Sequence, residues 1–190
     1  MTENNPATFD VEDWLTDAAL PEESATVYKR PDVIAELTDL KRRIGIESRA
    51  NEVEQTAGSK RADTLEKEYE NLLHTFADSA LTIYVRALSP DELKALRAAH
   101  EERTTGMDSL AANAEYGFDL LAASITHVKP AGGKRLPANL TPAKVKTMEE
   151  AIGGTQMTTV LAARQQAQNA LPTVDADFLR KPSGTEAGQG

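Results

Sequence analysis

Apolar side chains recur at helical spacing along two charged stretches in the first half of the chain. Each stretch places apolar residues at intervals of four, three and four, which aligns them on one face of a helix. The stripes consist of Val33, Leu37, Leu40 and Ile44 in the first stretch, and Leu65, Tyr69, Leu72, Phe76 and Ala80 in the second. The pattern predicts a helix over residues 32–55, a polar break at Gly58-Ser59 and a second helix, together an antiparallel helical hairpin.

Two short runs with high β-propensity flank this hairpin. The first covers residues 25–29 and ends before Pro31, and the second covers residues 81–86. Because two isolated strands are only marginally stable in water, we expect the runs to pair as a two-stranded ribbon that lies against the helices.

The second half of the chain contains a strong local helix start. Ser89-Pro90-Asp91-Glu92 combines an N-cap residue, a proline at the first helical position and a glutamate that closes a capping box. This motif predicts a helix that continues to about His100. Further helices are expected over residues 111–125, 141–152 and 155–170.

The segment 127–139 interrupts these helices and is interpreted as a loop. It holds two prolines and the pair Gly132-Gly133, which are typical of turns. The fold class predicted for the chain is therefore mainly α, with a helical hairpin and C-terminal helices and a small two-stranded β ribbon.

Composition along the chain indicates three parts. Residues 1–24 are an acidic N-terminal arm, in which Trp14 lies on a short amphipathic turn, and the first 28 residues hold seven acids and no Lys or Arg. Residues 25–179 are expected to form a single mainly helical domain. Residues 180–190 lack large apolar side chains and are expected to be a disordered tail.

Overall charge and composition exclude several classes of function. The chain of 190 residues is 27% charged with a formal net charge of -9, which disfavours binding to nucleic acid or to an anionic membrane. It has no cysteine, so disulfide scaffolds, thiolate metal sites and a cysteine nucleophile are excluded. The start of the chain does not resemble a signal peptide, and no apolar stretch is long enough to span a membrane.

One basic segment departs from this acidic character. Between Leu120 and Met148 there are five bases and no acid, and they are Lys129, Lys134, Arg135, Lys144 and Lys146. No aromatic side chain lies among these bases, as it would in a nucleic-acid site. The segment is interpreted as a solvated loop or as a surface that faces an acidic partner.

Residue patterns typical of catalysis or metal binding are not found. Gly132-Gly133-Lys134-Arg135 resembles a phosphate loop only superficially, because the required first glycine is replaced by Val128 and the required hydroxyl residue by Arg135. The three histidines are scattered, and His100, beside two glutamates, is expected at a solvated helix end. The sequence thus predicts no catalytic, cofactor-binding or metal-binding residues, and a protein that is not an enzyme.

The order of the local motifs carries a resemblance to a known family. An acidic start with Phe9 and Trp14 leads to Thr26-Val27-Tyr28, then to the run 81–88 and the helix start at Ser89. The later motifs are Tyr116 to Ile125, Leu140-Thr141-Pro142, Gly153-Gly154 with Gln156, a last helix rich in Gln and Asn, and Val174 to Leu179. Over roughly residues 9–179 this succession resembles the tail assembly chaperones of long, flexible-tailed phages that infect actinobacteria.

The resemblance implies a protein that binds other proteins transiently. It would hold the long helical tape measure protein in solution during tail assembly, with tail tube subunits as a further candidate client. It would act in the cytoplasm of the host cell, would not remain in the mature virion, and would need no cofactor. Two alternatives stay open, namely a structural head or tail completion subunit and a DNA-binding regulator with an unfamiliar site.

Five residues are the candidate partner-binding side chains. They are Leu65, Tyr69, Leu72 and Phe76 on the second stripe, together with Trp14 in the acidic arm. Such a stripe either fills the core of the hairpin or remains partly open as a groove for a partner helix. The sequence leaves both interpretations open.

Overall fold

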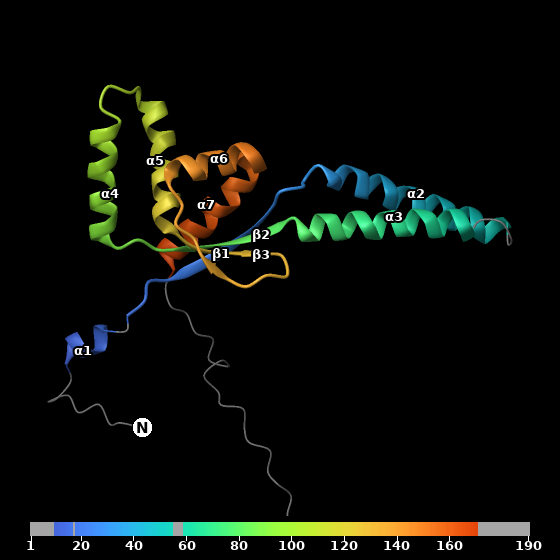
Figure 1. The fold of residues 1–190 in the computed structure, drawn as a ribbon, viewed down its shortest axis with the longest axis horizontal. Coiled ribbons are helices and arrows are strands. Elements are labelled where there is room, and N and C mark those ends of the chain that lie inside the picture. Colours follow the sequence, from blue (N-terminus) through green and yellow to red (C-terminus); the bar gives the residue numbers. More distant parts are fainter. Residues whose placement is uncertain (1–9, 17, 55–58, 171–190) are drawn as a thin grey trace, which may run out of the picture.

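Four strands form an antiparallel sheet that carries helices on one face, and a long helical hairpin projects from its end (Figure 1). The computed structural model describes residues 10–16, 18–54 and 59–170. The strands follow one another in the order β1-β2-β3-β4 and are β1 Glu22–Tyr28, β2 Ala80–Arg86, β3 Ile125–Pro130 and β4 Leu136–Pro137. The helices are α1 Val11–Leu15, α2 Val33–Glu54, α3 Ser59–Asp78, α4 Pro90–Arg103, α5 Ser109–Ser124, α6 Pro142–Ile152 and α7 Gly154–Asn169.

The sheet corrects the predicted fold class. The expected pairing of the first two strands is confirmed, with a register that runs from Glu22 opposite Arg86 to Tyr28 opposite Ala80. The prediction of a two-stranded ribbon is wrong, because β3 pairs with β2 and β4 pairs with β3. The chain remains mainly helical, but its helices pack on a four-stranded sheet.

The difference arises in the segment 127–139, whose prolines and glycines predict a loop. Its two prolines lie at strand ends, where the missing N–H is tolerated. Gly132 has a φ of +64°, and the N–H of Gly133 donates to the carbonyl of Pro130 at 3.0 Å. The glycine pair is therefore the turn of a β-hairpin, which brings β3 and β4 together.

Helices connect the strands in a regular way. The hairpin α2–α3 lies between β1 and β2 in the chain, and the hairpin α4–α5 lies between β2 and β3. The helices α6 and α7 follow β4 and pack with α5 against one face of the sheet (Figure 1). Among the described residues, no helix is both long and apolar enough to cross a membrane.

The main core lies between the sheet and α5, α6 and α7. Strand residues such as Ile83 and Val85 are fully buried at 0% exposure and contact apolar residues of these helices. The buried members of this core are Val27, Ile83, Val85, Leu121, Ile125, Val145, Met157, Val160 and Ala163. The opposite face of the sheet is polar, and the hydroxyls of Thr26 and Thr82 lie 3.1 Å apart on it.

Two glutamines attach α7 to the main chain of the sheet region. The side chain of Gln156 accepts from the N–H of Tyr28 at 2.7 Å and donates to its carbonyl at 2.9 Å. The side chain of Gln168 makes the same pair of bonds with Leu88, at 3.0 and 3.1 Å. A primary amide matches a backbone N–H and C=O pair, so these residues determine where α7 crosses the first two strands.

Local helix predictions agree with the structure. The helices expected over 32–55 and 155–170 are confirmed as α2 and α7. The capping box is also confirmed, since Ser89 Oγ accepts from the N–H of Glu92 and the Glu92 side chain accepts from the N–H of Ser89. The helix that it starts continues to Arg103, one turn beyond the expected end.

The predicted division of the chain lies partly outside the structure. β1 begins at Glu22, so the boundary placed between residues 24 and 25 falls inside this strand. The backbone of Trp14 lies in α1, as the amphipathic turn predicted. The tail 180–190 and the first nine residues lie outside the described residues.

Candidate partner-binding site

The projecting hairpin has a small core of its own. Val33 and Leu40 of α2 are each 2% exposed, and Leu65 of α3 is 4% exposed. Both helices pack mainly on each other, and Figure 1 shows the hairpin extending away from the sheet. Two helices alone can cover only part of each other's surface, so the hairpin keeps a less complete core than the body of the protein.

The stripe on α3 changes character along the hairpin. Leu65 is buried, whereas Tyr69, Leu72 and Phe76 are half-buried. At the base of the hairpin the ring of Phe76 stacks on the ring of Tyr28, with centroids 4.3 Å apart and planes inclined by 11°. The base is thereby attached to β1, while the middle of the stripe remains open to solvent.

An open groove runs beside Leu72. It has a volume of about 490 Å³ and lies mainly along α3, with one contribution from the start of α2. Its lining combines the apolar side chain of Leu72 with polar and charged side chains of both signs. The lining residues are Glu36, Thr64, Lys67, Glu68, Asn71, Leu72 and Thr75. Such a surface can accept one apolar anchor and hydrogen-bond the polar flanks of an amphipathic helix.

The structure separates Trp14 from the other four candidates. Leu65, Tyr69, Leu72 and Phe76 all lie on α3, as the spacing predicted. Figure 1 shows α1 beyond one end of the sheet and the α2–α3 hairpin beyond the other end. The side chain of Trp14 lies outside the described residues. Whether these five residues bind a partner stays a prediction.

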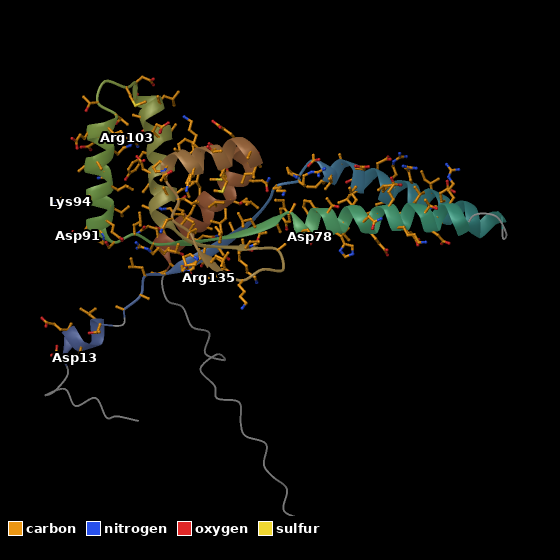
Figure 2. The ribbon with its side chains drawn as sticks, viewed as in Figure 1. Asp13, Asp78, Asp91, Lys94, Arg103 and Arg135 are labelled. Atoms are coloured by element: carbon orange, nitrogen blue, oxygen red, sulfur yellow. The ribbon has the colours of Figure 1, made fainter. Side chains whose placement is uncertain are left out.

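A buried carboxylate joins α4 and α5. Asp119 is 6% exposed, and its Oδ2 lies 2.7 Å from Nδ1 of His100 and also pairs with Arg103. Figure 2 shows Arg103 beside α5. The expectation of a solvated helix end at His100 is wrong, because its side chain is only 11% exposed. A buried carboxylate needs such partners, because an unpaired charge in the interior lowers the stability of the fold by roughly several kcal/mol.

The cluster around Asp119 has the geometry of a structural link. A histidine oriented by a carboxylate is also found in catalytic triads, where a nucleophilic hydroxyl bonds to the imidazole. Among the described residues, no hydroxyl bonds to the His100 ring, and Thr104 donates to the His100 carbonyl at 2.8 Å. Glu115 extends the network to α6, where Lys146 donates to it at 3.2 Å. The arrangement fixes α4, α5 and α6 to one another.

This cluster could not be located from the sequence pattern, because its members are far apart in the chain. The neighbours of His100 in the chain are Glu101 and Glu102, which point in other directions on a helix. The only available indication was Asp119 itself, a single acid within the apolar segment 116–125. An acid on a buried helix requires a cationic or hydrogen-bonding partner.

The basic segment finds an acidic partner within the same chain. Arg135 donates to Glu22 of β1 at 2.6 Å, and its guanidinium lies 4.1 Å from the centre of the Tyr84 ring (Figure 2). Partial burial raises the pKa of Glu22, but hydrogen bonds from Thr126 and Arg135 outweigh this effect and hold the pKa below its usual value. The other bases of the β3–β4 turn, Lys129 and Lys134, are exposed.

Comparisons with other proteins do not add a functional assignment. In the described part of the chain, no group of three or more His, Cys, Asp or Glu could hold a metal ion. No protein-family model, curated protein or solved structure matches this chain.

Proposed function

We propose that this protein is a phage tail assembly chaperone that transiently binds the tape measure protein and keeps it in solution. The α2–α3 hairpin is the client-binding arm, and tail tube subunits are a further candidate client. One observation carries the proposal, namely that this hairpin projects from the body with a groove open beside Leu72.

Geometry supports a helical client in particular. The groove follows α3 from Thr64 to Thr75, a length of about 16 Å at 1.5 Å per residue. A third helix laid along this groove would cover the half-buried side chain of Leu72 and complete a three-helix bundle. The tape measure protein is expected to be long and helical, so it can offer many such segments.

Charge supports a role in keeping a client soluble. The net charge of -9 gives each chaperone–client complex a strong repulsion from other complexes. Covering apolar surface stabilises a complex by about 25 cal/mol per Å². Because the stripe leaves only a small apolar area to cover, the chaperone–client complex can dissociate. The order of motifs described above, which resembles this chaperone family, supports the same conclusion.

The test is co-expression of the tape measure protein with variants of this chain. We expect the wild type to raise the soluble fraction of the client, and Leu72→Asp to abolish this effect while the chain stays folded. Leu73→Asp is the matched control, because Leu73 is the next residue, is 44% exposed and lies off the stripe. Equal client solubility with and without the chaperone would contradict the proposal.

A second measurement separates chaperone from structural subunit. Mass spectrometry of purified phage particles should find this protein absent or far below the number of tail subunits. A fixed, stoichiometric amount in the particle would support the completion-subunit alternative.

A further inference from the structure

One edge of β1 faces away from β2, and two hydrogen bonds show which of its residues lie on that edge. The N–H of Lys29 donates to the carbonyl of Ser79 at 3.1 Å, and the N–H of Ala87 donates to the carbonyl of Pro21 at 2.8 Å. Odd-numbered residues of this strand therefore bond to β2, because bonding alternates along an antiparallel ladder. The even-numbered residues direct their N–H and C=O groups away from β2, and they are Glu22, Ser24, Thr26 and Tyr28.

Hydrogen bonds from the described residues reach only part of this edge. Gln156 bonds to both backbone groups of Tyr28. In the described ranges, no group pairs with the outward backbone N–H and C=O of Glu22, Ser24 or Thr26, and all three residues are exposed. Natural edge strands are usually protected by a proline, by charged side chains or by a bulge, and of these the segment 22–26 has only Glu22 and Glu23, both at its first end.

We infer that β1 of a second copy of this chain pairs with this edge, antiparallel and centred on Ser24, so that the two sheets become continuous. The three free residues are spaced by two, which makes them self-complementary about a two-fold axis. Ser24 then lies opposite Ser24 of the second copy, and Glu22 lies opposite Thr26 of the second copy. Every free N–H meets a free C=O, while the bonds from Gln156 to Tyr28 remain intact.

Charge along the strand favours this antiparallel arrangement. Glu22 and Glu23 stand at one end of β1, after an acidic segment that includes α1, and Lys29 and Arg30 follow the other end. In the Ser24-centred register the two glutamates face Thr26 and Ala25, so no acid faces an acid. An antiparallel pairing directs the acidic segment before β1 of each copy toward the end of the other strand that Lys29 follows, whereas a parallel pairing would place Glu22 beside Glu22.

A single-cysteine experiment tests the register directly, because the natural chain contains no cysteine. In the inferred pairing the two Ser24 Cα atoms are about 5.5 Å apart, which is within disulfide range. We expect Ser24→Cys to form a disulfide-linked dimer of the full chain under mild oxidation. Thr26→Cys is the matched control, since its two thiols would lie about 13 Å apart along the strands and should stay reduced. Equal cross-linking of both variants, or none of Ser24→Cys, overturns the inference.

A proline substitution tests the same edge without a cross-linking reaction. Ser24→Pro removes an N–H that points away from β2, so the internal ladder and the far-ultraviolet circular dichroism should be unchanged. Light scattering at about 100 µM should give twice the monomer mass for the wild type and for Ser24→Ala, and the monomer mass for Ser24→Pro. A monomeric wild type at that concentration overturns the inference. If Ser24→Pro fails to fold, the cysteine pair still decides the question.

Discussion

Helices of the body and of the projecting hairpin both carry apolar side chains on one face, but the two regions bury these side chains to different degrees. In the body, Val145 of α6 and Val160 of α7 are both 0% exposed, because the helices pack on each other and on the sheet. In the hairpin, Leu65 is 4% exposed but Tyr69 and Leu72 remain half-buried. Two packed helices therefore bury part of the α3 stripe, and burial of all of it needs a further layer, which the hairpin lacks within the described residues.

This difference separates stability from function in the molecule. The body gains its stability from side chains that are already covered, and substitutions there act on the whole fold. The hairpin keeps apolar surface that no other described residue covers, and under the proposed function substitutions at Tyr69 and Leu72 should act mainly on binding. Four predictions test this difference between the body and the hairpin.

The largest effect is expected in the centre of the sheet. Ile83→Ala removes a side chain that is 0% exposed and leaves a cavity, so the free energy of unfolding should fall by about 3–4 kcal/mol. Thr82→Ala, on the polar face of the same strand, should cost less than about 1 kcal/mol. Urea unfolding of both variants measures the difference, and equal losses would contradict the placement of the core on one face.

A smaller loss is expected at the buried carboxylate of the body. Asp119→Ala leaves His100 without its partner at 11% exposure, whereas Arg103 can turn toward solvent at 47% exposure. The free energy of unfolding should fall by about 2 kcal/mol. Glu101→Ala, an exposed position on the same helix as His100, serves as the control and should be near neutral. Denaturation of the two variants at pH 7 provides the measurement.

In the hairpin we expect a change of binding with little change of stability. Leu72→Asp places a carboxylate at a half-buried position beside the groove, where water can still solvate it, and should cost about 1 kcal/mol. Hydrogen exchange should show that the body keeps its protection, while a client pull-down should lose its signal. Global unfolding of this variant would show that the stripe is core and not a partner surface.

The smallest effect concerns the ion pair at the start of α4. The hydrogen bond from Arg86, at 3.0 Å, and the capping bond from Ser89 lower the pKa of Glu92 from 4.5 to about 2. A lowered pKa stabilises the fold above pH 4.5, and this contribution is lost as the pH falls toward 2. Because Glu92 is largely solvated, Glu92→Gln should cost only about 0.5 kcal/mol at pH 7. Thermal unfolding should show this difference disappearing near pH 2, and a constant difference would contradict the assignment.

Predictability from sequence differed between helices and strands. The spacing of Leu65 to Phe76 and the capping box at Ser89 predicted α3 and α4, because helical hydrogen bonds join residues only four apart. β3 was missed because the prolines and the glycine pair of the segment 127–139 favour a loop, and only its pairing with β2, from Leu81 opposite Pro130 to Val85 opposite Ile125, makes it a strand. The candidate site followed the same division, since the stripe on α3 could be located but the groove beside Leu72 could not.

Sequence pattern was sufficient for the local features of this protein, namely its helices and their caps, the two β-prone runs that became β1 and β2, and the stripe of α3. These depend on neighbours in the chain or on β-propensity, so spacing and residue type are sufficient. Tertiary structure was needed to show that Asp119 meets His100, that Arg135 reaches Glu22, and which backbone groups of β1 face away from β2. Such contacts depend on how distant segments approach in space, and loop closure and packing of the whole chain determine that approach.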